Sequence, residues 1–491
     1  MTRSLTVRKG SYVDSVALMQ VSKRVSALPG VRSALVAMAT ELNLDLATGM
    51  GFTLPDRTAP NEMLVAIEAD DETAIADAYA EVEAALNARS APSATGFGTA
   101  PPPVTIGAAA RHVAAGLALI STPGRYAFAD AIDAVDAGLH TMVFSDNVPL
   151  EQEVALKRYA ADAGVLVMGP DCGTAVVGGV ALGFANVVRP GPIGIVAASG
   201  TGAQHLMTLL DGAGVGVSHC LGVGGRDLSE RVGGSSTLRA LDLLAGDEAT
   251  EVIVIVSKPP SPSVAETVRA HAATLGKPVV FGLLGKGQPD LTETARRTVE
   301  ATGRTWRAPQ HLSGAVDRAR DKGFLRGLFA GGTLCDEAMI LAVDVVGAVR
   351  SNIPLDPAWA LDDGLGSDGH TMIDFGDDEL TQGRPHPMID GSIRVERMRA
   401  EVADPTCGVL LLDVVLGLGA AADPAAELAP VITEATRAGI PVVAAVVGTR
   451  DDPQDLKRQA TTLNAAGAWV FYSNAEAART ALDLLAKGQS A

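Results

Sequence analysis

The stretch PIGIVAASGTGAQHLMTLL (192–210) joins an apolar strand to a helix through a short glycine-rich turn. Residues 193–198 are apolar throughout except for one glycine, which is typical of a strand buried on both faces. Residues 199–202 end this run abruptly, and apolar residues then recur at helical spacing. Because parallel sheets are built from such strand-to-helix units, the stretch predicts an α/β fold.

Strands and helices alternate along most of the chain. Short apolar strands separated by helix-length segments start near residue 104, and two further series of this kind start at residues 191 and 326. They predict a Rossmann-like half followed by two flavodoxin-like parallel-sheet units. The stretch SAPSATGFGTAPPP (90–103) is the clearest linker, and residues 304–320 are expected to be a connector with one helix. The predicted domains are a small α+β domain at 1–92, the Rossmann-like domain at 104–190, and flavodoxin-like domains at 191–310 and 320–491.

Composition excludes several classes of function. The chain has 491 residues, of which 47% are hydrophobic and 20% charged, and its formal net charge of −18 disfavours nucleic acid and anionic membranes as partners. The four cysteines are widely spaced, so neither a zinc site nor a disulfide framework is predicted. No signal peptide and no apolar run of membrane-spanning length is visible, and we therefore expect a cytoplasmic protein.

Ser199, Gly200 and Thr201 form a candidate anion site, because the first amides of a helix lack internal partners and carry a positive dipole end. The alternative is that Ser199 only caps the helix. The stretch LFAGGTLCDEA (328–338) repeats the design with Gly331, Gly332 and Thr333. Both helix starts are expected to point at one phosphate-like anion between the domains, with the two threonine hydroxyls facing solvent.

The loop at 371–398 is unusually rich in charged residues. His386 stands between two prolines, which suits an acid/base or an oxyanion donor, and Arg384 and Arg394 could fork onto a carboxylate or phosphate. The alternative is a solvated loop or a subunit contact. Asp374, Asp378 and His386 are residue types that could together hold a metal ion, but their spacing matches no standard pattern, so no metal site is predicted.

Several segments resemble the succinyl-CoA synthetase superfamily. Residues 129–176 and the segments IGIVAASGTGAQ (193–204) and CLGVGGRDL (220–228) resemble the α subunit, with Ser-Gly-Thr in place at the start of its "power helix". LFAGGTLCDEA resembles the equivalent power helix of the β subunit's ligase domain. With the N-terminal unit and the GRPHPMID loop (383–390), the whole chain looks like the FdrA family of this superfamily.

The departures from the synthetase pattern limit the reactions that the resemblance implies for this chain. The histidine that carries the phosphoryl group should follow PVVFGLLG, where this chain has GKGQPDLTETARR (285–297). The glutamate that orients it should follow EVIVIV, where this chain has Ser257 and Lys258. Residues 104–112 lack the glycine-rich loop that grips CoA, and no ATP-grasp domain is visible. The resemblance therefore implies neither CoA binding nor phosphorylation driven by a nucleoside triphosphate in this chain alone.

The two power-helix turns that remain imply that the chain binds an acyl phosphate made by another protein. Members of the FdrA family are implicated in allantoin and purine breakdown, as a component of an oxamate carbamoyltransferase that uses carbamoyl phosphate. On this hypothesis the two glycine turns hold the phosphate, His386 and Arg384 handle the transferred group, and Lys258 neutralises the anion or is an ordinary surface lysine. The turn Asp171-Cys172-Gly173 is expected to be structural and near the substrate.

Two alternatives stay open at this stage. The chain could be an NDP-forming acyl-CoA ligase that works with a separate ATP-grasp chain, or a non-catalytic regulatory or scaffold subunit. Its expected partners are a small anionic substrate and the subunits encoded beside it, or a second copy of the chain in a homodimer.

Overall fold

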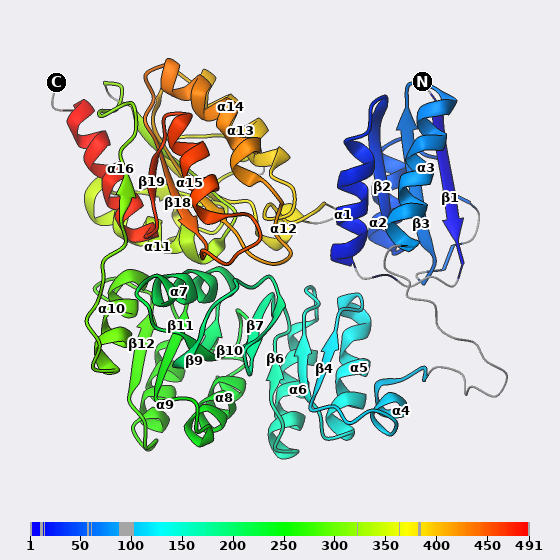
Figure 1. Ribbon diagram of the computed structural model, residues 1–491, viewed down its shortest axis with the longest axis vertical. Helices are drawn as coiled ribbons and strands as arrows, with labels where there is room; N and C mark the ends of the chain where they lie inside the picture. Colours follow the sequence, from blue (N-terminus) through cyan, green and yellow to red (C-terminus); the bar gives the residue numbers. More distant parts are fainter. Residues whose placement is uncertain are drawn as a thin grey trace. The chain divides into compact units, whose positions relative to one another are not determined.

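The computed structural model contains two compact units, whose helices and strands are drawn in Figure 1. One unit is Met1–Val104 with Glu379–Asp390, and the other is Thr105–Asp378 with Gly391–Ala491. The structure describes residues 2–9, 13, 15–55, 58–59, 61–87, 103–321, 323–362, 364–381 and 384–489.

The smaller unit contains β1 (Thr2–Arg8), α1 (Ser15–Ser26), β2 (Val31–Met38), α2 (Glu41–Gly49), β3 (Met63–Ala69) and α3 (Glu72–Asn87). Its strands form an antiparallel sheet in the order β1-β3-β2. The central strand β3 is almost wholly buried, and it packs with apolar residues of α1 and α3 in one core. The segment 379–390 belongs to this unit, where Lys23 of α1 donates to the backbone oxygen of Ile389 at 2.9 Å.

The larger unit begins with a small parallel sheet. Its elements are α4 (Ile106–Ala110), β4 (Leu117–Ile120), α5 (Gly124–Asp136), β5 (His140–Val143), α6 (Leu150–Asp162) and β6 (Val167–Met168). The strands pair in parallel in the order β4-β5-β6, and apolar residues of α5 and α6 form a core with them. This is the Rossmann-like half that the sequence predicts.

The second sheet has a flavodoxin-like strand order. Its elements are β7 (Thr174–Val177), β8 (Val180–Gly183), β9 (Pro190–Ala198), α7 (Gly200–Gly212), β10 (Val217–Gly222), α8 (Ser235–Gly246), β11 (Val252–Ser257), α9 (Pro262–Ala272), β12 (Val279–Leu283) and α10 (Leu291–Ala301). The parallel strands run β10-β9-β11-β12, so the first strand of the series lies between the second and the third. Strands β7 and β8 extend this sheet as an antiparallel edge, so it begins before residue 191.

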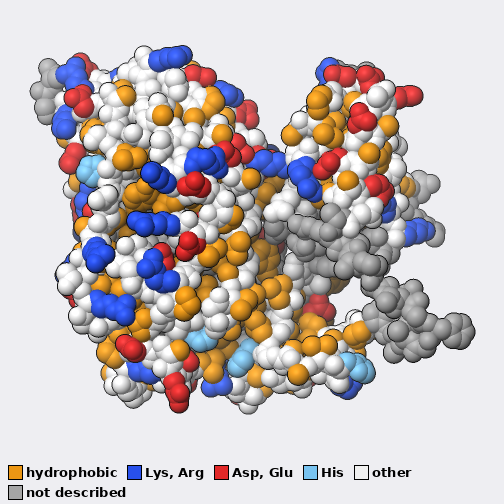
Figure 2. All heavy atoms as spheres, in the orientation of Figure 1, with side chains coloured by type: hydrophobic (Ala, Val, Ile, Leu, Met, Phe, Trp, Pro, Cys, Tyr) orange, Lys and Arg blue, Asp and Glu red, His pale blue; other side chains and the backbone are white. Residues whose placement is uncertain are grey.

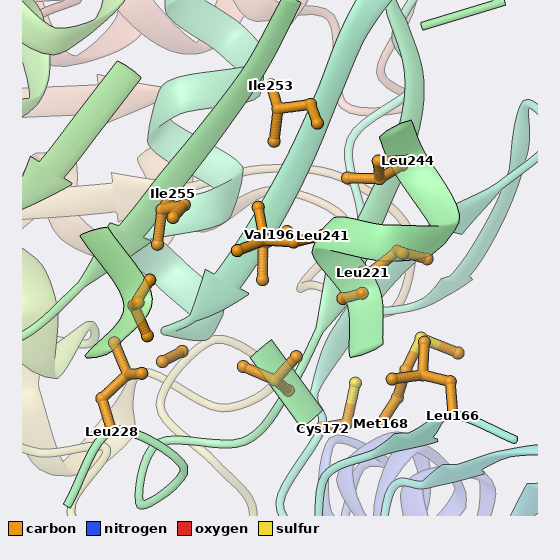
Figure 3. Close-up of a cluster of buried hydrophobic side chains, with 14 of the residues drawn as sticks. Leu166, Met168, Cys172, Val196, Leu221, Leu228, Leu241, Leu244, Ile253 and Ile255 are labelled. Atoms are coloured by element: carbon orange, nitrogen blue, oxygen red, sulfur yellow. The ribbon is translucent and has the colours of Figure 1, made fainter. Parts of the chain in front are cut away.

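Apolar side chains from both of these sheets share one core. Figure 3 shows Val196, Ile253 and Ile255 from the second sheet together with Leu241 and Leu244 of α8. Leu166 and Met168, at β6 of the small sheet, belong to the same cluster. This burial, which stabilises the fold in proportion to the apolar area removed from water, fixes the small sheet against its neighbour.

The third sheet repeats the flavodoxin order more fully. Its elements are β13 (His311–Leu312), β14 (Phe324–Phe329), α11 (Gly332–Val346), β15 (Val349–Arg350), the 3-10 helix η1 (Pro357–Trp359), β16 (His370–Asp374), α13 (Ser392–Ala403), β17 (Cys407–Val415), α14 (Pro424–Arg437), β18 (Val442–Val447), α15 (Leu456–Ala465), β19 (Trp469–Phe471) and α16 (Asn474–Gln489). The short helix α12 (Asp378–Thr381) belongs to the smaller unit except for its first residue. Apart from the two-residue edge strand β15, which pairs in parallel with β16, the parallel strands run β16-β14-β17-β18-β19, which is the 2-1-3-4-5 order of flavodoxin.

The predicted fold class is confirmed, with one local error. Residues 304–320 contain no helix; the chain there is extended and includes only the two-residue strand β13. Pro309 and Gly314 break the helical pattern, and the indole of Trp469 donates to the backbone oxygen of Val316 at 2.9 Å. Among the described residues, no helix combines the length and apolar character needed to cross a membrane. Acidic and basic side chains are interspersed on the face shown in Figure 2.

Candidate functional site

Two helix N-termini meet in the larger unit. Helix α7 starts directly after β9, and α11 starts directly after β14; each strand is the first of its flavodoxin-like series. In both sheets the chain leaves this strand towards one side and later returns on the other, which makes the strand's carboxyl end a topological switch point. Figure 1 shows α7 and α11 next to each other. The arrangement therefore brings the ligand-binding edges of two sheets to one place.

The two helix ends are joined by their hydroxyl groups. Ser199 is the N-cap of α7, and its Oγ accepts from the amide of Gly202 at 2.9 Å. The same Oγ lies 2.6 Å from Oγ1 of Thr333, in the first turn of α11. Thr333 is only 2% exposed, so the expectation that its hydroxyl faces solvent is wrong. Ser199 has the capping role that the sequence left open, and Ser199 and Thr333 bond each other.

Close contact between the two turns requires glycine. A β-carbon at Gly331 would lie 2.7 Å from Cγ2 of Thr201, and one at Gly202 would lie 3.0 Å from Cγ2 of Thr333. These separations are shorter than a side chain can normally tolerate. The helix ends therefore pack directly on each other, and a ligand that used both would lie across them.

Several amides at this junction are available. Among the residues that the structure describes, no acceptor is found for the amides of Gly200, Thr201, Gly332 and Thr333. The hydroxyl of Thr201, which is half-buried, also has no hydrogen-bond partner in this part of the chain. Unpaired amides at the positive ends of two helix dipoles are the features that bind phosphate groups in proteins.

Lys258 lies at the same junction. It follows β11, and its Nζ would be 2.9 Å from a β-carbon at Gly332, the first residue of α11. Its Nζ also lies 3.5 Å from Oδ2 of Asp336, while 41% of its side chain remains accessible to solvent. Asp374, the last residue of β16, places its Oδ2 against Gly332. The N-terminus of α11 thus has one ammonium group and two carboxyl groups beside it.

Burial and mutual charge shift the pKa values of these three groups. Burial acts to lower the pKa of Lys258, but Asp336 and Asp374 outweigh it and the pKa is raised, so Lys258 stays cationic. Burial raises the pKa of Asp374 to about 7, against the opposing effect of Lys258. Burial also raises the pKa of Asp336. The site therefore keeps a fixed positive charge, while its negative charge varies near neutral pH.

Asp413 of β17 organises the turn before α11. Its two carboxylate oxygens accept from the amides of Ala330 at 2.7 Å and Gly331 at 2.9 Å. Arg394 of α13 donates to Asp413 Oδ1 and to its backbone oxygen, both at 2.8 Å. The sequence suggests Arg394 as a ligand for a bound carboxylate or phosphate, but it is buried and both of its terminal nitrogens donate to Asp413. The signal missed in the sequence is a lone aspartate inside the apolar run GVLLLDVVLG, because a buried charge requires a partner.

The turn after β6 contributes a strained aspartate. Asp171 has a left-handed backbone with φ of 57° and an exposed side chain. Cys172 is buried, with a pKa raised to about 12 chiefly by that burial, which excludes a thiolate nucleophile at neutral pH. Gly173 accepts from the amide of Phe184 through its carbonyl at 2.8 Å, as in a structural turn.

The other two predicted catalytic residues belong to the smaller unit. His386 is partly buried, and its Nδ1 accepts from the amide of Met388 at 3.2 Å. Arg384 is exposed, whereas Pro387, Met388 and Ile389 are buried. The structure thus gives the loop an apolar anchor in that unit, and the catalytic assignment of His386 and Arg384 stays a prediction.

Replacing Thr201 and Thr333 with valine should have different effects on ligand binding and on stability. Thr201→Val removes an unpartnered hydroxyl and should weaken binding of an acyl phosphate about tenfold, the scale of one hydrogen bond to a charged group. Thr333→Val removes the partner of Ser199 and should reduce stability by about 1–3 kcal/mol, with little effect on binding. Calorimetric titration and thermal unfolding of both variants measure the two effects. The reverse pattern would assign the ligand-binding hydroxyl to Thr333.

Comparison with known proteins identifies two parts of the chain. Residues 328–484 match the family model described as CoA-ligase. Residues 1–102 match a model described as AllF, heavy metal-associated domain. Together with the paired flavodoxin-like sheets, the first match defines a CoA-ligase-like protein of the acyl-CoA synthetase superfamily.

Individual relatives show to which family of this superfamily the chain belongs. The chain is 37% identical to the uncharacterized protein YahF of Escherichia coli over 519 aligned residues, which cover 100% of both chains. It is 29% identical to the α subunit 2 of the ADP-forming succinate–CoA ligase of Archaeoglobus fulgidus, over 30% of this chain and 52% of that one. The chain therefore spans about half the length of that ligase subunit. With its full-length likeness to YahF, the chain belongs to the FdrA family of the acyl-CoA synthetase superfamily.

One solved structure that the chain matches is the dinucleotide-forming acetyl-coenzyme A synthetase 1 of Ca. Korarchaeum cryptofilum, in complex with phosphate and ADP. The match has 16% identity and a TM-score of 0.30, and it covers 82% of this chain and 88% of that chain.

The residues present do not fit two groups that the family descriptions suggest. Heavy metals are bound mainly by cysteine and histidine, and residues 1–102 contain neither. In the described part of the chain, no three metal-ligating side chains come together. For CoA, the segment 104–112 forms the short helix α4, and the amide of its one glycine, Gly107, donates to Asp133 at 2.7 Å. Neither a metal ion nor CoA is therefore part of the function proposed below.

Proposed function

We propose that this protein transfers an acyl group from an acyl phosphate to a small acceptor, as a subunit of an oxamate-type carbamoyltransferase in allantoin or purine catabolism. Carbamoyl phosphate is the acyl phosphate in this proposal. The observation that carries it is the junction of α7 and α11, where free helix amides and the ammonium group of Lys258 lie side by side. Such a junction suits a phosphate group that is bound and then released.

The reaction needs no phosphorylated protein side chain. The acceptor nitrogen attacks the carbonyl carbon, a carbon–nitrogen bond forms, and the carbon–oxygen bond to phosphate breaks. The proton lost by the acceptor nitrogen ends on the departing phosphate. Because the acyl phosphate is already activated, the protein has to position both reactants and stabilise the negative charge on the leaving phosphate.

The described residues suit these tasks to different degrees. The amides of Gly200, Thr201 and Gly332 and the hydroxyl of Thr201 would bind the phosphate. Lys258 would neutralise the charge that grows on the leaving oxygen. Ser199, Gly331 and Thr333 would act through their contacts, by holding the two helix starts against each other.

His386 is proposed as the acid or base for the transferred group, with Arg384 beside it in the chain to bind the acceptor's carboxylate. Replacing His386 with alanine should reduce turnover about a hundredfold, the usual scale for a general acid or base. Binding of carbamoyl phosphate and the thermal unfolding temperature should change little. Steady-state kinetics and calorimetry test this, with Arg384→Ala expected to raise the KM for the acceptor. Near-normal turnover of the histidine variant would leave the loop a role in anchoring the N-terminal unit.

The decisive experiment assays carbamoyl phosphate and oxamate with the purified chain, alone and together with the subunits encoded beside it. Release of inorganic phosphate that depends on oxamate is the expected result. Activity only in the mixture would indicate a hetero-oligomeric enzyme, and activity of the chain alone would fit a homodimer or a monomer. Binding of carbamoyl phosphate without turnover in either case would favour a regulatory or scaffold subunit.

The CoA-ligase alternative has its own readout. Incubation with γ-labelled ATP, succinate and CoA, with and without an ATP-grasp partner, should leave no label on this chain, because residues 285–297 hold no histidine where the phosphoryl carrier is expected. A stable phosphorylated side chain on this protein would overturn the acyl phosphate proposal in favour of the ligase.

A further inference from the structure

Asp374 presents one carboxylate oxygen to the junction of the two helices. Its backbone is fixed by Asn352, which bonds both the amide and the carbonyl of Asp374 at 2.9 Å. Its Oδ1 accepts from the amide of Gly376, also at 2.9 Å. Its Oδ2 has no donor among the described residues and lies directly against Gly332, at the start of α11. Asp374 is 4% exposed, and Oδ2 is the carboxylate oxygen that no described protein donor uses, so it is the one left to accept from a ligand or from water.

The surroundings of this oxygen are unsuited to a phosphate. Asp336 lies on the same side, as the fifth residue of α11, and Asp377 follows three residues after Asp374. Lys258 is the cation that faces them, and it pairs with Asp336 at 3.5 Å. Two carboxyl groups beside one ammonium group repel a second anion at short range. The phosphate of a bound ligand therefore belongs nearer to Gly200 and Thr201 than to Asp374.

An acyl phosphate bound in this direction turns its acyl group towards Asp374. In carbamoyl phosphate the acyl group ends in an amino group, which has two hydrogens to donate. In acetyl phosphate it ends in a methyl group, which has none. We propose that Oδ2 of Asp374 accepts a hydrogen bond from the amino group of carbamoyl phosphate and so selects carbamoyl phosphate over other acyl phosphates. This inference rests on the proposed function and names the residue that determines its substrate.

The selection works mainly by rejecting the wrong ligand. Acetyl phosphate would cover a buried carboxylate with a methyl group and leave it without a partner, whereas carbamoyl phosphate replaces the lost water contact. The expected preference for carbamoyl phosphate is about 10- to 100-fold in the dissociation constant, the scale of one hydrogen bond to a buried charged group.

Asp374→Asn is the most informative variant, because it keeps the size of the side chain. Its oxygen should retain the bond from Gly376, which directs the amide nitrogen to the position of Oδ2. A donor then faces the ligand in place of an acceptor. The variant should bind the two acyl phosphates with similar affinity, through weaker binding of carbamoyl phosphate. A matched control is Asp211→Asn, since Asp211 is also buried but pairs with Arg189 near the opposite end of α7.

Isothermal titration of the full chain at pH 8 with carbamoyl phosphate and with acetyl phosphate gives the ratio of affinities. The inference is supported if the wild type and Asp211→Asn prefer carbamoyl phosphate at least about tenfold and Asp374→Asn does not. An unchanged ratio in Asp374→Asn overturns the inference and leaves the acyl phosphate function standing. Failure of the wild type to bind either compound overturns the proposed function itself.

The wild type alone provides a second test if the asparagine variant does not fold. Lys258, Asp336 and Asp377 face Asp374, and together with its burial they place its pKa at about 7. Below that pH the carboxyl group of Asp374 is neutral, so leaving its Oδ2 without a hydrogen-bond donor costs less free energy. The preference for carbamoyl phosphate should therefore grow between pH 6 and pH 8. Because the phosphate groups of both compounds ionise alike, the ratio of the two dissociation constants cancels that effect of pH. A constant ratio over this range would contradict the role of Asp374.

Discussion

Replacing Lys258 with methionine is expected to lower turnover with carbamoyl phosphate by about 100- to 1,000-fold, the loss found when one preorganised donor to a developing oxyanion is removed. Lys258 is a cation next to the free amides at the start of α11, which packs against the start of α7. Its positive charge is secure at neutral pH, because Asp336 and Asp374 raise its pKa despite its burial. Methionine keeps the length and most of the packing of the side chain but removes the charge.

The same substitution should affect binding less than turnover. In the ground state the helix dipoles and the amides of Gly200, Thr201 and Gly332 still hold the phosphate, whereas the charge on the bridging oxygen develops only as the carbon–oxygen bond breaks. Steady-state kinetics should show the loss mainly in kcat. Lys286→Met is a suitable control, since Lys286 forms an exposed ion pair with Asp344 at 3.1 Å. Equal activity in the two variants would make Lys258 an ordinary surface lysine.

The sequence predicts the architecture well because apolar periodicity reflects burial. The strands β9, β11, β14 and β18 are short apolar runs followed by turns, and each is found in a parallel sheet. The order of the strands follows from the alternation of strand and helix, with the right-handed connections that parallel sheets require. Local error occurs where no periodic pattern exists, as at 304–320, which contacts the end of the third sheet through Trp469.

The site is only partly visible in the sequence, and the reason is geometric. The two glycine turns can be recognised singly, because each follows an apolar strand and opens a helix. Their direct contact cannot be recognised, since Ser199 and Thr333 are separated by 134 positions along the chain and meet only through tertiary packing. For the same reason the sequence does not reveal that Thr333 is buried while Thr201 is accessible.

The carboxyl groups of the site illustrate the other limit. Asp374 and Asp413 stand in or at the end of apolar strands, where a charge requires compensation, but the compensating groups come from distant positions. Asn352 and Gly376 hold Asp374, whereas Arg394 and two backbone amides hold Asp413. Asp374 therefore keeps one carboxylate oxygen that can accept a hydrogen bond from a ligand, whereas both carboxylate oxygens of Asp413 accept hydrogen bonds inside the protein. Sequence alone cannot distinguish these two roles.

Replacing Asp413 with alanine should have the largest effect on stability of the substitutions considered. It leaves the buried guanidinium of Arg394 without its carboxylate and the amides of Ala330 and Gly331 without an acceptor. Removing one partner of a buried ion pair typically costs about 3–5 kcal/mol. Because the lost bonds hold the turn that opens α11, amide hydrogen exchange should accelerate first at residues 328–335, and the thermal unfolding temperature should fall.

A second substitution separates the ion pair from simple loss of packing. Arg394→Leu in the Asp413→Ala background removes the unpaired buried charge, so the double variant should be more stable than Asp413→Ala alone. Faster exchange at 328–335 should nevertheless persist in the double variant, because the two amides still lack their acceptor. If the double variant were less stable than the single one, Arg394 would stabilise the fold through its hydrocarbon chain. If exchange at 328–335 were unchanged in both, the α11 turn would keep its shape without Asp413, and the free amides at its end would owe their orientation to the contacts with Thr201 and Ser199 alone.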